Sequence, residues 1–415
     1  MEEILRKENE ELRKRNEELE EEVKKWKSEL DKFKESSRYQ LRQLKEYNDS
    51  LKEQLRSVGD GFMKENEEAS EEMSEEIEIF KQYVYSPTVT PPVYTEKVVL
   101  DSIHQANVLC VVFWDKNDMF LFSADVQNRL VCINSEDQTV VCEMKVSAPC
   151  CSLTTVNHGT LLLAGCMDGL LHVFSIDSTN YCITSLTKMN QQKLHEKAIL
   201  KLRSCDTLDA VLSTSYDNTV ALFNVDKLGT ITEKARYYFK YTCDGIAFSP
   251  KHRSIIIAER NQPFMTYINL DTQEKTEVSI NNHDWDLHVS FCIIDLCLMH
   301  DEDYVVALTD KGRVIIFGYG KNTHIQVIYD GSMLSDSYYN GVVVVDREEN
   351  HVLTICPDYC IHVFSLYSGK EVAVLKGHSK TIRNMTCQRD LTTTLYTCSY
   401  DHSIRVWKQV GYSLC

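Results

Sequence analysis

The chain has 415 residues, a formal net charge of −17, sixteen cysteines and 43% hydrophobic residues. This length accommodates two or three structural units, and the acidic balance argues against a broad nucleic-acid or anionic-membrane footprint. The sequence has no apolar span of about 18 residues, and its N-terminus is charged rather than signal-like. We therefore expect a protein of the cytoplasm, or of the nucleus, that does not insert into a membrane.

Residues 2–58 carry a helical heptad pattern without proline or glycine. Apolar residues that alternate three and four apart predict a coiled coil over residues 1–58. Two asparagines in the seam favour a parallel homodimer, because an amide there pairs best with its own copy. The alternative is a single solvated helix with charge pairs along it. The expected seam residues are Leu5, Asn9, Leu12, Asn16, Leu19, Val23, Trp26, Leu30, Phe33, Leu44 and Leu51.

The first part of this heptad pattern is unusually regular, since residues 9–12 and 16–19 have the same sequence. Roughly the first 25 residues are therefore either native or a fused zipper. In the second case, the dimer depends on residues 30–58 alone.

Two segments separate the heptads from the rest of the chain. Glycines at 59 and 61 break the helix, and residues 59–85 then resume helical spacing with a strongly acidic composition. Such a helix usually has a solvated face, although it could also pack on the downstream domain or on another protein. Residues 86–93 contain three prolines, which predict an extended linker.

From residue 94 onward, short alternating apolar runs are separated by polar turns, which predicts antiparallel strands. The turn aspartates recur at Asp125, Asp168, Asp217, Asp310, Asp358 and Asp401. The long gap after Asp217 holds one further unit, residues 254–269, without its aspartate. Seven such units predict the blades of a propeller. We expect residues 97–103 to pair as the outer strand of the last blade and so to close the ring.

The last unit, residues 374–407, combines Gly377-His378, the turn Ser399–Ser403 and a final tryptophan. It resembles a WD-repeat unit. The resemblance implies an all-β seven-bladed propeller over residues 94–415, preceded by the long α-helical coiled coil. It also implies a hydrogen-bonded network within the last blade, formed by His378, Thr397, Asp401 and Trp407. The other blades end in phenylalanine, so a partial network is expected there.

The resemblance further implies that the residue before each turn aspartate points to the binding end of the ring. Tyrosine and methionine are enriched at interface cores, so this end is predicted to bind a protein or peptide. The alternative is that these residues merely fill turns. The expected protein-binding residues are Met167, Tyr216, Thr309, Pro357 and Tyr400, with Lys197 and Lys380 flanking the two tyrosines.

Candidate chemistry is sparse. No cysteine pair has CxxC spacing, and Cys356 and Cys360 are interpreted as strand positions. The cysteines are therefore expected to be reduced, buried thiols. His283 and His288 have no second cluster to complete a metal site. Since no nucleophile turn or acid–base pair is evident, we expect no catalytic residue, no cofactor and no metal.

These observations predict a non-enzymatic scaffold or adaptor that dimerises through the coiled coil and binds proteins or peptides on the propeller. The layout is similar to striatin-type scaffolds, to autophagy coiled-coil/propeller factors and to mitochondrial-fission adaptors, among which fold alone does not choose. One alternative is a subunit or substrate receptor of a ubiquitin ligase, although no RING or U-box is present. Another is a microtubule or motor-trafficking regulator.

Overall fold

The computed structural model describes residue 24, residues 26–27, and residues 73–85, 93–281, 291–329, 341–388 and 393–410. The chain divides into two compact units, Met1–Ser74 and Glu75–Cys415. In the first unit, Trp26 lies in helical backbone and its side chain is exposed. The other seam residues, and residues 86–92 of the linker, lie outside the described residues. The coiled coil and its dimer therefore stay predictions.

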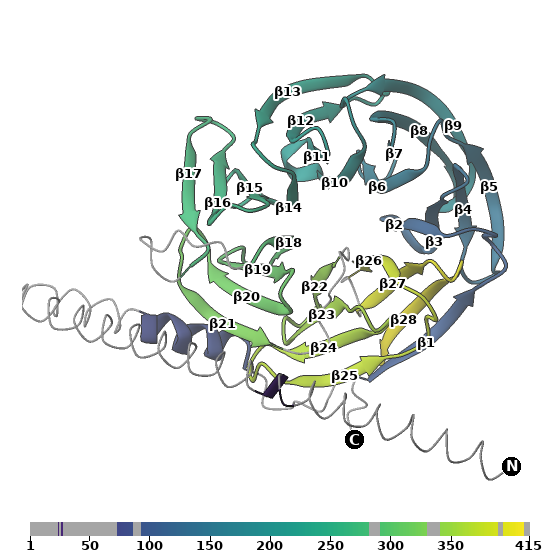
Figure 1. The fold of residues 1–415 in the computed structure, drawn as a ribbon. Helices are drawn as coiled ribbons and strands as arrows, with labels where there is room; N and C mark the ends of the chain where they lie inside the picture. Colours follow the sequence, from purple (N-terminus) through teal and green to yellow (C-terminus); the bar gives the residue numbers. More distant parts are fainter. Residues whose placement is uncertain are drawn as a thin grey trace, which may run out of the picture. The chain divides into compact units, whose positions relative to one another are not determined.

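The described part of the second unit contains seven antiparallel sheets of four strands, arranged around a ring (Figure 1). This is the predicted seven-bladed, all-β propeller, and it includes the fourth blade that lacks its aspartate. From the inside outward, the blades are β2 (Val108–Trp114), β3 (Asn117–Asp125), β4 (Arg129–Asn134), β5 (Thr139–Lys145); β6 (Cys150–Val156), β7 (Leu161–Cys166), β8 (Leu170–Thr179), β9 (Cys182–Lys193); β10 (Ile199–Cys205), β11 (Ala210–Ser215), β12 (Thr219–Val225), β13 (Ile231–Tyr238); β14 (Cys243–Ser249), β15 (Ser254–Glu259), β16 (Phe264–Asn269), β17 (Lys275–Ser279); β18 (Ile293–Leu298), β19 (Tyr304–Thr309), β20 (Arg313–Gly318), β21 (His324–Tyr329); β22 (Val343–Val345), β23 (His351–Ile355), β24 (Ile361–Ser365), β25 (Glu371–Leu375); and β26 (Ile382–Gln388), β27 (Thr394–Ser399), β28 (Ile404–Val410), β1 (Val93–Leu100).

The core of the propeller lies between neighbouring blades. In blades two to seven the second strand is buried along its whole length, as in β7 and β15. Both faces of such a strand are covered, so its sequence is a mostly apolar run. One cluster joins Leu163 and Val173 of the second blade to Ile199 and Phe223 of the third. Each blade therefore completes its core with side chains from the next blade, so the fold needs the ring.

The ring is closed by β1. This strand pairs antiparallel with β28, from Val93 opposite Val410 to Leu100 opposite Ile404. The predicted clasp is confirmed, although the strand starts four residues earlier than expected and ends at Leu100. A bulge between Glu96 and Val98 interrupts the register, and the Glu96 carboxylate forms an ion pair with Arg405. The last blade thus combines one strand from the start of the propeller sequence with three strands from its end.

Residues 59–72 of the predicted acidic helix lie outside the described residues, and the described remainder packs on the propeller rather than standing free. Residues 73–83 are helical (dark blue in Figure 1), and Phe80 and Val84 are buried to 1% and 2% exposure in a cluster with strands of blades five and six. The Phe80 ring stands edge-on to Tyr304, with centroids 4.9 Å apart. Ion pairing between Glu76 and Lys321 adds to the contact. Among the described residues, no helix has the length and apolar character needed to cross a bilayer.

Candidate protein-docking face

Two kinds of connection meet at one end of the ring. They are the turns between the second and third strands of each blade and the segments that lead from one blade to the next. Backbone hydrogen bonds tie them together: the Tyr216 N–H donates to the Ala198 carbonyl at 3.1 Å, and the Tyr400 N–H to the Thr381 carbonyl at 3.0 Å. We call this end the upper face. The lower face carries the two other turns of each blade.

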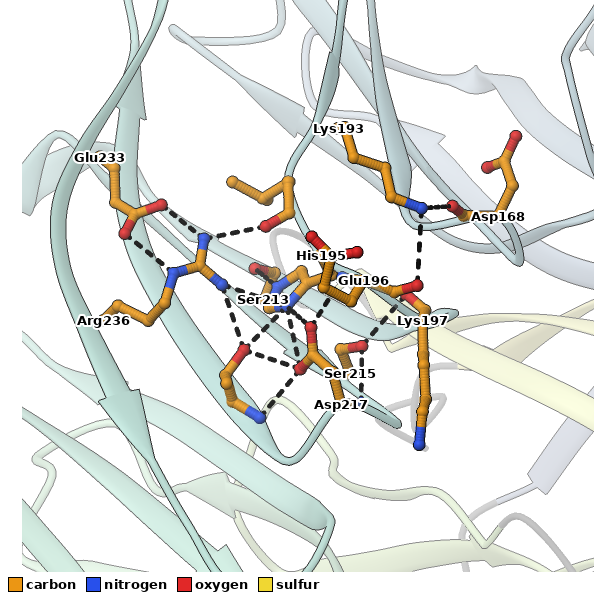
Figure 2. Close-up of polar contacts among 12 residues, drawn as sticks. Asp168, Lys193, His195, Glu196, Lys197, Ser213, Ser215, Asp217, Glu233 and Arg236 are labelled. Atoms are coloured by element: carbon orange, nitrogen blue, oxygen red, sulfur yellow. Dashed lines mark hydrogen bonds and ion pairs between the residues drawn. The ribbon is translucent and has the colours of Figure 1, made fainter.

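A buried polar network holds the upper turn of the third blade (Figure 2). His195 Nε2 lies 2.7 Å from the Ser213 hydroxyl, and His195 Nδ1 lies 3.1 Å from Asp217 Oδ2. The Asp217 carboxylate also accepts the backbone N–H groups of Glu196 at 2.9 Å and Thr219 at 3.0 Å. Because buried polar groups are costly unless they are hydrogen-bonded, this network fixes both connections of the blade.

The ionisation of this network follows from its surroundings. Burial lowers the pKa of His195 below its ordinary value, although Asp217 opposes the shift. Burial alone would raise the pKa of Asp217, but hydrogen bonds from Thr219 and Glu196, together with His195, hold it below its ordinary value. These shifts favour a neutral imidazole beside a carboxylate. Nδ1 then donates to Asp217, and Nε2 accepts from Ser213.

An arginine on the outer strand extends the network to the edge of the blade. Arg236 of β13 donates from Nη2 to the Leu194 carbonyl at 2.8 Å and from Nη1 to the Thr219 hydroxyl at 3.1 Å. Its Nε donates to Glu233 at 2.9 Å, and Figure 2 shows the guanidinium between Glu233 and the histidine cluster. The connection that enters the third blade is thereby held from both its inner and its outer side.

The seventh blade repeats the arrangement and adds the tryptophan. His378 Nδ1 lies 2.9 Å from Asp401 Oδ2, and His378 Nε2 lies 2.9 Å from the Thr397 hydroxyl. The Trp407 Nε1–H donates to the same hydroxyl at 3.1 Å. The four side chains named from the sequence thus form one continuous chain of hydrogen bonds. The third blade ends in Phe223 and lacks the last link.

The first blade holds a third network, and sequence reasoning missed its histidine as well as His195. His104 contacts Asp125 Oδ2 and the Ser123 hydroxyl, both at 2.8 Å. A usable signal was present, because in all three blades the histidine precedes the aspartate by 21 to 23 residues. Asp125 ends strand β3 instead of standing in the turn, which obscured the pattern.

Most of the predicted docking residues lie at the upper face. Met167 and Tyr216 each expose 46% of their surface, and Tyr400 is half-buried. The side chains of Lys197 and Lys380 are exposed. Each lysine has the same backbone contact, since its carbonyl accepts a serine hydroxyl from the neighbouring strand, at 3.1 Å in blade three and 2.9 Å in blade seven.

Thr309 does not belong to this surface. It is fully buried, and its hydroxyl donates to the Arg313 carbonyl at 3.1 Å. Asp310 takes the position of Tyr216 in blade five, because its N–H donates to the Cys292 carbonyl at 2.9 Å. The aspartate there is the first residue of the turn rather than the second. An alignment on the aspartates therefore shifts this blade by one residue.

The same backbone contact identifies the equivalent positions in other blades. Val126, 38% exposed, donates to the Asn107 carbonyl, and Arg260 donates to the Thr242 carbonyl. Pro357 stands directly before the turn aspartate in blade six and is half-buried, but proline has no N–H to make this contact. We call the six positions that make the contact the upper-face ring; it comprises Val126, Met167, Tyr216, Arg260, Asp310 and Tyr400.

The innermost strands line a cavity of about 540 Å³ along the axis. Lys201, on the first strand of blade three, donates to Asp295 Oδ1 and to the Ile294 carbonyl, each at 2.7 Å. Asp295 Oδ2 accepts the Val343 N–H at 3.0 Å. Burial lowers the pKa of Lys201, although Asp295 opposes the shift. These paired charges join blades three, five and six, which is a structural role.

A comparison with protein families matches residues 369–408 to the WD domain, G-beta repeat. This segment covers β25, β26, β27 and β28 as far as residue 408. No curated protein matches the chain. The family match over one repeat and the seven four-stranded sheets together support a WD-repeat β-propeller in the described part of residues 93–410, a fold typical of protein-interaction scaffolds.

Proposed function

We propose that this chain is a non-enzymatic scaffold whose propeller binds a protein or peptide partner on the upper-face ring. The observation that carries the proposal is a repeated pair of side chains. Tyr216 with Lys197, and Tyr400 with Lys380, occupy equivalent positions in blades three and seven, each above a histidine–aspartate network.

The chemistry of the ring suits a peptide with an apolar or aromatic anchor and acidic neighbours. Val126, Met167 and Tyr216 stand on consecutive blades and are partly exposed, so they offer apolar area to the anchor. The two lysines would attract carboxylates of the ligand. Because the turns beneath are already fixed by hydrogen bonds, little conformational freedom remains to be lost on binding.

We further propose that the heptads of residues 1–58 join two chains into a parallel homodimer in the cytoplasm. Two linked propellers would raise the effective concentration of the second binding event. No disulfide links any of the fifteen described cysteines, which supports a reducing compartment. The seam lies almost wholly outside the described residues, so the heptad pattern alone supports this dimer.

Peptide selection followed by affinity measurement tests the docking proposal. Ligands selected from a random peptide library on the full chain are titrated by fluorescence anisotropy against wild type and the Tyr216→Ala/Tyr400→Ala variant. Buried tyrosines at interfaces are worth about 2 kcal/mol or more, so we expect at least roughly a tenfold rise in Kd.

A matched variant on the lower face controls for loss of exposed apolar surface. Tyr181 and Leu228 are 68% and 79% exposed and lie in turns between third and fourth strands. Tyr181→Ala/Leu228→Ala should bind selected peptides like wild type. Equal affinity of both double variants for every selected peptide, or a selection that enriches none, would contradict docking on the upper-face ring.

A further inference from the structure

The upper turn of the sixth blade has a composition that docking does not explain. Residues 356–362 read CPDYCIH. Cys356, Asp358 and His362 offer a thiol, a carboxylate oxygen and an imidazole nitrogen that all lie within 4.8 Å of one another. The Cys356 N–H donates to the Cys360 carbonyl at 2.9 Å. Both cysteines therefore face each other across one turn, which corrects their interpretation as strand positions.

Asp358 is held in one orientation by the turn. Its Oδ1 accepts the Cys360 N–H at 3.1 Å, and its Oδ2 lies 2.9 Å from His362 Nε2. Cys356 and His362 are buried, whereas Asp358 is exposed. Two donors thus come from the interior of the blade and one comes from the surface. This arrangement leaves the shared point between them open to solvent on one side.

His362 lies between two carboxylates. Its Nδ1 is 2.6 Å from Glu371 Oε2 on β25, while its Nε2 faces Asp358. An imidazolium would donate to both, but the neutral imidazole, which is the form that binds a metal ion, has one N–H and can donate to only one of them. If Nδ1–H donates to Glu371, the lone pair of Nε2 points at a carboxylate, and a cation between the two would remove that conflict. A histidine whose second nitrogen donates to a carboxylate is the usual support of a metal-bound imidazole.

The second blade provides an internal comparison with the same spacing. Cys166, Asp168 and His172 stand in the corresponding turn. There the Ser147 hydroxyl lies 2.6 Å from Asp168 Oδ2 and 2.9 Å from His172 Nε2. One hydroxyl can donate to the carboxylate and accept from the imidazole, so this cluster is satisfied without a cation. His172 Nδ1 has no hydrogen-bond partner, so the counterpart of Glu371 is missing.

We propose that Cys356, Asp358 and His362 bind a single zinc ion, with Glu371 as the positioning residue of the histidine. A thiolate, an imidazole and a carboxylate form a donor set that zinc accepts. Zinc–ligand bonds of about 2.0–2.3 Å place tetrahedral donor atoms about 3.3–3.8 Å apart, which small side-chain movements reach from the present spacing. The fourth position is left for water or for a side chain of a bound protein.

Cobalt titration of the full chain tests this site, because Co²⁺ substitutes for zinc and reports bound thiolate by a near-ultraviolet charge-transfer band. The chain is stripped with a chelator, desalted under reducing conditions and titrated. We expect one equivalent of Co²⁺ to develop the band together with tetrahedral visible bands, and Zn²⁺ to abolish both. A wild-type chain without a thiolate band at one equivalent would overturn the proposal.

Variants locate the site. Cys356→Ser should abolish the charge-transfer band, and His362→Gln should abolish tight binding. Glu371→Gln should keep the band but weaken binding roughly 10- to 100-fold. The matched control, Cys166→Ser/His172→Gln, has the same spacing and should titrate like wild type. A band that persists in Cys356→Ser, or that disappears in the control, assigns the metal elsewhere and overturns the proposal; circular dichroism of each variant verifies the fold.

Discussion

Phe80 anchors the acidic helix to blades five and six, and its removal should detach that helix selectively. Its side chain is 1% exposed and contacts the Tyr304 ring. Phe→Ala at a buried site costs about 3–5 kcal/mol. Since the neighbouring surface can partly relax, we expect about 3 kcal/mol, which raises the detached population roughly 100-fold. Alanine has the higher helix propensity, so a loss cannot be attributed to the helix itself.

Native-state hydrogen exchange of Phe80→Ala measures this equilibrium. Amides in residues 77–84 should exchange about 100-fold faster, while those of β2–β9 should keep wild-type rates. Ile79→Ala is the matched control, because Ile79 lies in the same helix with 52% of its surface exposed, and its effect should stay within about 0.5 kcal/mol. Wild-type exchange in Phe80→Ala, or equal acceleration throughout the propeller, would refute selective detachment.

Four further outcomes are expected. Thr397→Val leaves two buried ring nitrogens without their hydroxyl partner and should lower the free energy of unfolding in urea by about 2–4 kcal/mol; a change below about 0.5 kcal/mol would contradict the network. The pKa of Asp401 lies well below its ordinary value because hydrogen bonds from His378 and its turn outweigh burial, so stability present above about pH 4 should be lost as the pH falls, and Asp401→Asn should flatten that profile. Deletion of residues 93–100 exposes the edge of β28, so light scattering should detect aggregates of the shortened chain. A soluble particle with the same mass as wild type would contradict this expectation. The Leu44→Asp/Leu51→Asp variant should disrupt the coiled-coil dimer and halve the particle mass. A mass equal to that of wild type would disprove the predicted seam.

The number of blades and the closing strand could be predicted because both depend on local periodicity and on the need to pair strand edges. Alternating runs survive even where the turn aspartate is lost, as in residues 254–269. The position of side chains on the upper face could not be predicted equally well. In blade five the turn begins at the aspartate itself, one residue later than in blade three, so Asp310 takes the place of Tyr216 and Thr309 is buried in the strand. The spacing of the aspartates along the sequence does not reveal this difference.

Long-range partners explain the other differences. The acidic composition of residues 59–85 suggests a solvated helix, and only the spacing of Ile77, Phe80 and Val84 indicates an apolar stripe. That stripe is buried against Tyr304 and its neighbours. These partners lie more than two hundred residues further along the chain, so local sequence spacing does not reveal the contact. The zinc proposal has the same origin. Its ligands are adjacent in sequence, but Glu371 reaches His362 only through the pairing of β24 with β25.

The two tyrosines of the upper-face ring permit a test of binding that leaves the fold intact. The turn beneath Tyr216 is held by its own N–H and by the Ser215 hydroxyl, which accepts the Asp217 N–H at 3.1 Å. The turn of Tyr400 has the same contact at 3.1 Å. Neither contact involves a phenol, so Tyr→Ala should change affinity while the melting temperature stays close to that of wild type.

A double-mutant cycle on this pair then distinguishes two modes of docking. If one ligand spans blades three and seven, loss of the first tyrosine weakens the hold on the second, and the two changes in binding free energy will not add. If each tyrosine contacts an independent part of the ligand, the changes will add within about 0.5 kcal/mol. Either result requires that the single variants weaken binding, because a ligand indifferent to both tyrosines does not occupy this face.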